Sequence, residues 1–250
     1  MLRVFSSLLI FALLPFGFIQ AQLNNHPDHI KTENGELIIH PILHGTIVFE
    51  WNGLNIYVDP YGSKDLYEGK ADPDLILITH PHGDHLNLET LNSLNTEGAT
   101  FIVPQAVADE IPEKYSGQVL VMGNGESMER NSIQIEAIPM YNLPEEGARH
   151  AKGWGNGYVL TIGEKNIYVS GDTEDIPEMR NLSGIDIAFI CMNLPYTMDI
   201  NQAADAVLDF EPSIIYPYHH RGQDMHEFKK LVDKGNKDIE VRLKDWYPGQ

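Results

Sequence analysis

Apolar residues along the chain gather into short runs that are separated by glycine, proline and asparagine. The runs are short for helices and rich in valine, isoleucine, tyrosine and phenylalanine, so they predict buried strands. One run, residues 133–138, alternates apolar and polar side chains, which is typical of a strand with one buried face. The predicted strands cover residues 37–42, 46–51, 54–58, 75–78, 101–104, 119–121, 133–138, 157–162, 165–170, 186–192 and 213–218.

Turn and helix signals separate these runs. Asn52-Gly53 and Gly163-Glu164 each predict a hairpin between two neighbouring strands. Helices are predicted after residue 87 and at residues 105–111, 201–210 and 225–234. Strands that alternate with helices in this way predict an α/β fold.

The two predicted hairpins end alike. The return strand of the first reads Asn55-Ile56-Tyr57-Val58 and is followed by Asp59. The return strand of the second reads Asn-Ile-Tyr-Val over residues 166–169 and is followed, after Ser-Gly, by Asp172. Each hairpin therefore delivers an acidic group at the end of its return strand.

The chain begins with a pattern typical of a secretory signal peptide. Arg3 precedes an apolar stretch over residues 4–19, and a small residue, Ala21, stands at the expected cleavage point. We expect an exported, periplasmic protein. The alternative is an uncleaved membrane anchor, although Pro15 interrupts the stretch, which is short for a membrane span; N-terminal sequencing of the native protein separates the two. The expected organisation is a signal peptide at 1–21, a flexible lead-in at 22–36 and one hydrolase domain at 37–250.

Length and charge limit the possible functions. A chain of 250 residues suits one large α/β domain. The net charge of −19 argues against a nucleic-acid binder and against electrostatic attachment to anionic lipid, so we expect neither partner nor a stable membrane attachment after cleavage. Cys191 is the only cysteine, which excludes a zinc site built from several thiolates. The partner that remains is a small molecule, and the sequence leaves the oligomeric state open.

The chemistry is concentrated in residues 79–86, which read Thr-His-Pro-His-Gly-Asp-His-Leu. His80, His82, Asp84 and His85 follow directly after the predicted strand at 75–78, in the loop where it ends. Imidazole and carboxylate are ligands of zinc and of similar divalent ions. Four such groups in one tight loop would desolvate and repel one another without a metal, so the loop predicts a metal site.

This loop resembles the signature of the metallo-β-lactamase superfamily. The resemblance covers residues 37–245 and implies a four-layer αββα sandwich of two similar halves, with the active site at one edge of both sheets. The sequence Asn-Ile-Tyr-Val, which both predicted hairpins share in their return strands, fits such a duplication. The Gly-rich segment at 153–158 is similar to that of the metal-dependent hydrolase branch, which includes ascorbate 6-phosphate lactonase and is related to N-acylphosphatidylethanolamine phospholipase D.

The resemblance also implies the remaining ligands. One metal would be held by His80, His82 and His150. A second would be held by Asp84, His85 and His219, and Asp172 would bridge the two. Asp84 and Asp172 would then be the catalytic carboxylates. His220 is the alternative to its neighbour as the last ligand, but the ligand of the family comes directly after the strand, which favours His219.

Further residues are candidates for supporting roles. Asp59 is a candidate for accepting a hydrogen bond from a ligand histidine, with an ordinary Asp-Pro turn as the alternative. His44 is a candidate for facing the site. Arg149, Lys152 and Arg221 flank ligands and are candidates for contacting an anionic substrate, with solvated surface charges as the alternative. His220 is a candidate for lying beside the ligands, with an exposed position beside Arg221 as the alternative.

The implied cofactor is a pair of divalent ions, zinc or manganese, with iron as a further possibility. Such a pair would supply a metal-bridging hydroxide for the hydrolysis of an ester, lactone, amide or phosphodiester in a small anionic substrate. Asp172 stands where β-lactamases that destroy antibiotics carry cysteine, which argues against that activity. His82 stands where the di-iron flavoprotein branch carries glutamate, which weakens a redox interpretation. A redox metalloenzyme of the same fold and a non-catalytic exported carrier of metal or ligand are the alternatives.

Overall fold

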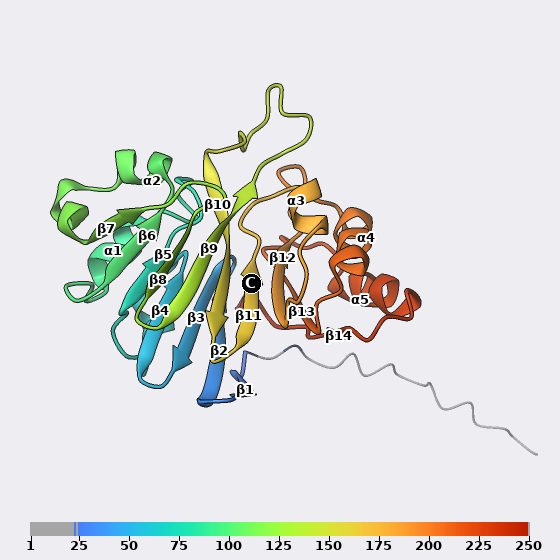
Figure 1. The fold of residues 1–250 in the computed structure, drawn as a ribbon, viewed down its shortest axis with the longest axis horizontal. Coiled ribbons are helices and arrows are strands. Elements are labelled where there is room, and N and C mark those ends of the chain that lie inside the picture. The colour runs from blue at the N-terminus through green and yellow to red at the C-terminus, as the bar shows by residue number, and fades with distance from the viewer. Residues whose placement is uncertain (1–22, 24, 250) are drawn as a thin grey trace, which may run out of the picture.

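In the computed structural model of the protein, two seven-stranded sheets lie face to face at the centre of the molecule (Figure 1). In the first sheet the strands follow one another in chain order, from β1 to β7. They are β1 (Asp28–Thr32), β2 (Gly35–Leu43), β3 (Thr46–Trp51), β4 (Leu54–Val58), β5 (Leu75–Leu77), β6 (Thr100–Val103) and β7 (Val119–Val121). The pairs from β1 to β4 are antiparallel and those from β4 to β7 are parallel.

The second sheet runs in the reverse chain order, from β14 to β8. Its strands are β8 (Ser127–Arg130), β9 (Ile133–Met140), β10 (Gly155–Ile162), β11 (Lys165–Val169), β12 (Ile187–Cys191), β13 (Ile214–Tyr218) and β14 (Glu240–Val241). The pairs from β8 to β11 are antiparallel and those from β11 to β14 are parallel. Each sheet is thus a meander that continues into parallel strands.

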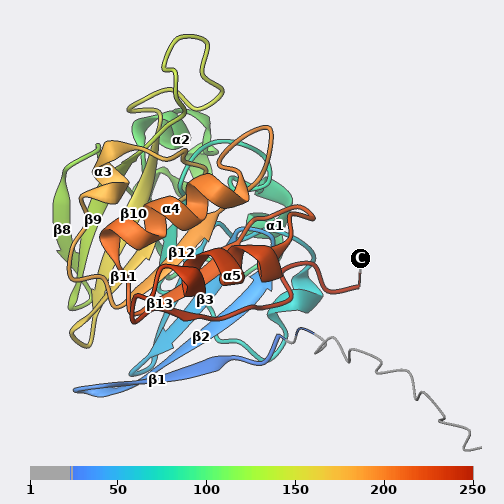
Figure 2. The same cartoon turned by 90° about the vertical axis from the view of Figure 1, so that its right-hand side faces the viewer.

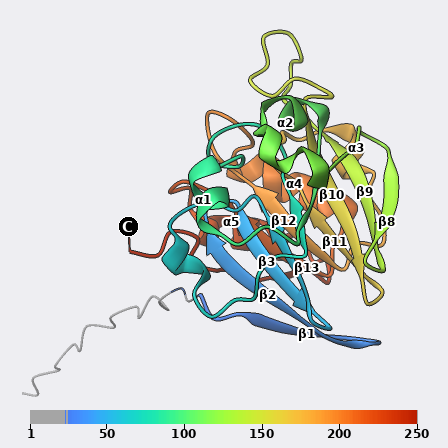
Figure 3. The same cartoon turned by 90° about the vertical axis from the view of Figure 1, so that its left-hand side faces the viewer.

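Helices cover the outer faces of the two sheets. In Figure 2, α4 (Ile200–Phe210) and α5 (Met225–Lys234) lie over the second sheet, with the short α3 (Pro177–Arg180) beside them. In Figure 3, α1 (Leu88–Ser93) and α2 (Gln105–Glu110) lie over the first sheet. Short 3₁₀ helices, Lys64–Tyr67 and Glu113–Gln118, complete the connections on that side. The predicted αββα sandwich is confirmed.

Alternation along the strands explains this layering. In β5, Leu75 and Leu77 belong to the core between the sheets, whereas Ile76 packs into a second cluster beneath the helices α1 and α2. The same division holds in β3, where Phe49 points inward and Val48 outward. Successive side chains of a strand face opposite ways, so a strand covered on both sides needs apolar residues at every position.

The echoed hairpins occupy equivalent places in the two sheets. β4 and β11 each pair with an antiparallel partner on one side and a parallel partner on the other. In each, the backbone N–H of the first echoed residue donates to a carboxylate, Asn55 to Asp74 at 2.8 Å and Asn166 to Asp186 at 2.9 Å. The fold therefore contains the two similar halves that the sequence indicates.

The structure describes residue 23 and residues 25–249, so the predicted signal peptide lies outside the described residues. Among the residues described, no helix is long and apolar enough to cross a membrane. The flexible lead-in expected over residues 22–36 is wrong for its second half, because residues 28–32 form strand β1, which pairs with β2.

Candidate metal centre

The ligand loop is fixed at both of its ends. It begins where β5 ends and finishes at Asn87, whose side chain caps α1 by accepting a hydrogen bond from the backbone N–H of Thr90 at 2.9 Å. The Asn87 amide also donates to the carbonyl of Gly83 at 2.9 Å. A turn in which His85 N–H donates to the carbonyl of His82 at 2.9 Å lies between. The short span makes successive side chains converge on one edge of the sheets.

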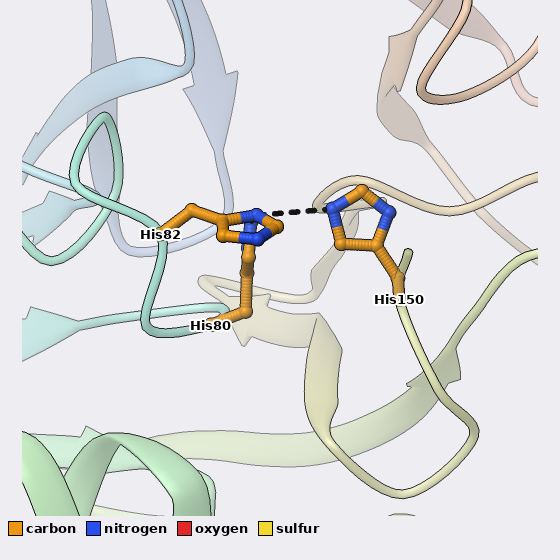
Figure 4. Close-up of side chains that lie close together, drawn as sticks. All are labelled: His80, His82 and His150. Atoms are coloured by element: carbon orange, nitrogen blue, oxygen red, sulfur yellow. Dashed lines mark hydrogen bonds between the residues drawn. The ribbon is translucent and has the colours of Figure 1, made fainter. Parts of the chain in front are cut away.

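Three imidazoles form the first group of candidate ligands. His80 and His82 come from the loop after β5, and His150 comes from the long loop between β9 and β10 (Figure 4). Nε2 of His80 lies 2.9 Å from Nδ1 of His82, and Nε2 of His150 lies 3.2 Å from the same atom. The ring nitrogens of these three residues therefore converge on one point.

The second group lies on the other side of the ligand loop. Nε2 of His85 and Nε2 of His219 are 3.2 Å apart, and the Asp84 carboxylate lies 3.9 Å from the same His219 atom. His44 joins this group, because its Nε2 lies 2.9 Å from Oδ2 of Asp84. His219 follows directly after β13, at the strand exit where it was expected.

Asp172 lies between the two groups. Its Oδ1 is 3.5 Å from Nε2 of His85 and 3.3 Å from Nε2 of His219. Its Oδ2 is 3.6 Å from Nε2 of His150 and 3.9 Å from Nε2 of His80. One carboxylate oxygen thus faces each group, which is the arrangement of a bridging ligand.

The position of Asp172 depends on a glycine. Gly171 has a φ of +58°, a conformation that favours glycine. A Cβ at this position would lie 2.7 Å from Sδ of Met140 and 3.2 Å from Cβ of Thr79. The turn can therefore bring Asp172 against the ligand loop only because the preceding residue has no side chain.

The donor set fits divalent ions. His80, His85, His150 and His219 are fully buried, and Oδ1 of Asp172 is buried without a hydrogen-bond partner among the described residues. A buried carboxylate oxygen in that state is costly unless it binds a cation. Ring nitrogens and carboxylate oxygens without thiolate suit zinc, manganese and iron.

Burial and neighbouring charge set the pKa values of these groups in opposite directions. Burial lowers the pKa of His80 and of His219 well below the ordinary value, and lowers that of His150 to about 4. These rings are therefore neutral and able to bind a metal through a lone pair. Burial also opposes a charge on His85, but the carboxylates of Asp172 and Asp59 outweigh it and raise its pKa to about 9.

Asp59, one of the supporting candidates, contacts the ring of His85. It is fully buried, and its Oδ2 lies 2.7 Å from Nδ1 of His85. The backbone N–H of Thr79 donates to its Oδ1 at 2.8 Å and the Thr79 hydroxyl donates to its Oδ2 at 2.7 Å. In the neutral ring, a proton on Nδ1 of His85 points at Asp59 and leaves a lone pair on Nε2, on the metal side. A cation bound there would take the place of the second proton that the carboxylates around His85 favour.

Asn142 has the corresponding role at His150. Its Oδ1 lies 3.0 Å from Nδ1 of His150 and also accepts the backbone N–H of that residue at 2.8 Å. Asn142 was not predicted, because nothing in the local sequence pattern marks a residue that supports a histidine eight positions away.

Asp84 is contacted by His44 and by Arg221, and Tyr247, which was not predicted, contacts both of these residues. His44 contacts it through Nε2, and Nη2 of Arg221 lies 3.3 Å from the same oxygen. Tyr247 joins both, since its hydroxyl lies 2.8 Å from Nδ1 of His44 and accepts the backbone N–H of Arg221 at 3.0 Å. Burial raises the pKa of Asp84, but the hydrogen bond with His44 and the nearby imidazoles outweigh it and hold the pKa well below the usual range.

Two cavities lie beside these groups. A polar cavity of about 270 Å³ opens onto the ligands and is called here the metal cavity; it is lined by His82, Gly83, Asp84, Arg149, Asp172, Asn193, Tyr196 and Arg221. A larger cavity of about 570 Å³ adjoins it at Arg221 and is lined also by His44, His220 and Tyr247. The structure therefore brings Arg149 and Arg221 to the metal cavity, but it places His220 in the adjoining one.

The fold and the two groups of ligands at the edge of both sheets define a protein of the metallo-β-lactamase type. The family model described as "Beta-lactamase superfamily domain" matches residues 39–219, and the chain belongs to that superfamily. Within it, the chain belongs to the UPF0173 metal-dependent hydrolases. A member from Pyrococcus furiosus is 32% identical over 209 residues, which cover 78% of this chain and 90% of the relative.

Two further comparisons agree with this assignment. A UPF0173 metal-dependent hydrolase from Methanopyrus kandleri is 29% identical over 222 residues, which cover 83% of this chain and 95% of the relative. A solved structure from Parabacteroides distasonis, classed as a metal-dependent hydrolase, is 36% identical with a TM-score of 0.79 and covers 88% of this chain and 98% of its own.

Proposed function

We propose that this protein is a dinuclear hydrolase that cleaves an ester, lactone, amide or phosphodiester bond in a small anionic substrate. The observation that carries the proposal is the placement of Asp172, which turns one oxygen toward each group of imidazoles. A mononuclear site has no use for two converging groups on either side of one carboxylate.

The proposed ligands divide as the family resemblance implies. The first ion would be held by His80, His82 and His150 and the second by Asp84, His85 and His219, with Asp172 shared. When bound, a pair of divalent ions supplies an activated water and an electrophile for a carbonyl or phosphoryl oxygen. Zinc and manganese are the ions that we propose for these nitrogen and oxygen donors.

The residues around the ligands fix orientation and access. Asp59 and Asn142 hold the rings of His85 and His150 from behind, so that the metal-facing nitrogens are preset. Asp84 is held by His44 and is the more exposed of the two carboxylates, with 27% of its side chain accessible. The substrate would therefore approach from the metal cavity, on the side of Asp84.

The single cysteine takes no part in this site. The Cys191 thiol is buried and donates to the carbonyl of Thr173 at 3.3 Å, and burial raises its pKa to about 12. A thiol in that state is neither a metal ligand nor a nucleophile. The chemistry is therefore left to imidazole and carboxylate groups.

Removal of metal tests the proposal directly. We expect that dialysis against a chelator abolishes hydrolysis, and that zinc or manganese restores it as the metal content approaches about two equivalents per chain. A panel of esters, lactones, amides and phosphodiesters with anionic groups would be assayed before and after, with elemental analysis of each sample. Turnover that requires dioxygen and bound iron would instead support the redox alternative, and tight metal binding without turnover of any panel member would support a carrier.

The histidine pair after β13 gives a sharper test. His219→Ala is expected to abolish hydrolysis and to weaken the second metal, because its Nε2 faces both Asp172 and His85. His220→Ala is expected to keep most of both, since His220 lines the adjoining cavity and contacts the ring of Tyr247. Loss of a residue that only supports a ligand costs roughly 10- to 100-fold in affinity or activity.

The two variants serve as controls for each other, because each removes an imidazole and the two substituted residues are neighbours in the chain. Circular dichroism would establish that both fold, and metal content would be measured beside turnover. If His220→Ala lost the second metal and His219→Ala kept it, the proposed ligand set would be wrong by one residue at this strand end.

A further inference from the structure

We infer that Arg149, Asn193 and Tyr196 form an anion subsite in the metal cavity, which binds a carboxylate or phosphate group of the substrate beside the bond to be cleaved. The inference rests on the proposed function, because it gives the second recognition element of the same substrate. The three residues come from two loops, the one between β9 and β10 and the one after β12.

Asn193 is the first observation. It is 2% exposed and lines the metal cavity, yet Oδ1 of its side chain has no hydrogen-bond partner among the described residues. Buried side-chain amides almost always have partners, so an unpartnered one at a cavity wall indicates that a ligand completes it. Rotation of the amide presents its N–H groups in place of the oxygen, so Asn193 can donate to an anion.

Arg149 is the second observation. Its guanidinium lies 4.5 Å from the ring centre of Tyr196, and it forms no ion pair with any described residue. The neighbouring cations are already paired, Lys152 with Glu178 at 2.7 Å and Arg221 with Asp84 at 3.3 Å. In a chain with 36 acidic and 17 basic residues, an unpaired guanidinium at the metal cavity is an unused binding group. Its planar fork matches a carboxylate or a phosphate.

Asn142 ties these residues to the metal ligands. Its Oδ1 accepts from His150, and its Nδ2 donates to the carbonyl of Tyr196 at 2.9 Å. One side chain therefore links the loop that carries Arg149 and His150 to the loop that carries Asn193 and Tyr196. The distance between the anion subsite and the first group of imidazoles is set by this link, which is what recognition of a substrate with a fixed length requires.

Binding to the metal-loaded protein tests the subsite without any turnover. Succinate and butyrate each have four carbons and differ by one carboxylate, so one end can occupy the metals and only succinate has a second end for the subsite. By calorimetry we expect succinate to bind roughly 10- to 100-fold more tightly, the value of a charge-assisted hydrogen bond. Arg149→Met and Asn193→Leu are expected to remove most of that preference.

Lys152→Met is the matched control, because it removes a cation three residues away that is paired with Glu178. It is expected to keep the preference for succinate. If Lys152→Met lost the preference for succinate as fully as Arg149→Met, any nearby positive charge would account for the preference. That result would refute a specific subsite at Arg149. The 4-nitrophenyl ester of 3-phosphonopropionate, esterified at its carboxyl end, leaves only the phosphonate for the subsite, so its kcat/KM beside that of 4-nitrophenyl hemisuccinate compares the two anions.

Hydrolysis of the 4-nitrophenyl esters of the same two acids separates the subsite from the proposed function. We expect kcat/KM to favour the hemisuccinate, and Arg149→Met to raise KM for that ester alone. An Arg149-dependent preference for succinate with neither ester cleaved would support the subsite and count against ester hydrolysis. Two results together would overturn the subsite: equal kcat/KM for both esters, and an affinity for succinate that Arg149→Met leaves unchanged. The proposed hydrolase function would still stand.

Discussion

Replacing Asp172 with asparagine is expected to reduce the metal content from about two equivalents per chain to less than one, and to abolish hydrolysis. Among the described residues, Asp172 is the one carboxylate whose oxygens lie within 4 Å of imidazole nitrogens of both groups. Two divalent ions about 4 Å apart repel each other by ~16 kcal/mol at an effective dielectric constant of ~20. A shared anion offsets that repulsion, whereas a neutral amide of the same size does not.

Asp175→Asn is the control for this experiment. Asp175 stands three residues later and is paired with Arg180 on the helical side of the second sheet. Asp175→Asn is expected to lower the free energy of unfolding slightly, because it weakens the ion pair with Arg180, and to retain both metals. Elemental analysis after gel filtration, with circular dichroism for folding, compares the two variants. An Asp172→Asn protein that still holds about two equivalents would contradict the bridging role of Asp172.

Much of the metal centre could be predicted because its chemistry is local in the sequence. His80, His82, Asp84 and His85 lie within six positions and follow a strand, so their convergence needs no knowledge of the fold. His150, Asp172 and His219 were named from the family resemblance, and in the structure the Asp172 carboxylate lies 3.6 Å from Nε2 of His150 and 3.3 Å from Nε2 of His219. The hairpin echo is also local, and it anticipated the two similar sheets.

Other supporting residues, Tyr247, Asn142 and Asn193, could not be predicted, because nothing in the local sequence pattern marks their contacts. Tyr247 contacts His44 across 203 positions, and Asn142 supports a histidine through a loop without any regular pattern. Asn193 follows the end of β12, and parallel strands present their carboxyl ends at one edge of a sheet. That rule could have placed Asn193 near the ligands, although it could not have shown that its amide lacks a partner.

The error at the lead-in has a similar cause. Strand β1 reads Asp-His-Ile-Lys-Thr and lies at the edge of its sheet, where it pairs only with β2. An edge strand with an open face needs no apolar run, so the hydrophobic pattern gives no sign of it. Asp28 instead fixes it by ion pairs, with Lys244 at 2.7 Å and with Arg242 at 3.5 Å. These partners come from the far end of the chain.

Replacing Asp59 with asparagine is expected to weaken the second metal by roughly 10- to 100-fold while the protein still folds. The carboxylate accepts from Thr79 through Oδ1 and faces Nδ1 of His85 through Oδ2. The amide oxygen of asparagine can still accept the backbone N–H of Thr79, but the NH₂ group then points at Nδ1 of His85. The ring would turn to the tautomer that carries its proton on Nε2, the nitrogen that faces Asp172, and a protonated nitrogen cannot bind a metal.

Asp74→Asn is the matched control, because Asp74 also accepts a backbone N–H, from Asn55, but lies at the other end of strand β4 from Asp59. Each substitution disturbs a hydrogen bond to a carboxylate and is expected to cost about 1–3 kcal/mol of the free energy of unfolding. Only Asp59→Asn should also lower metal affinity, measured by equilibrium dialysis beside a thermal melt. Loss of affinity in both variants would mean that stability alone controls the site, and unchanged affinity in Asp59→Asn would show that the His85 ring is held by the metals and not by the carboxylate behind it.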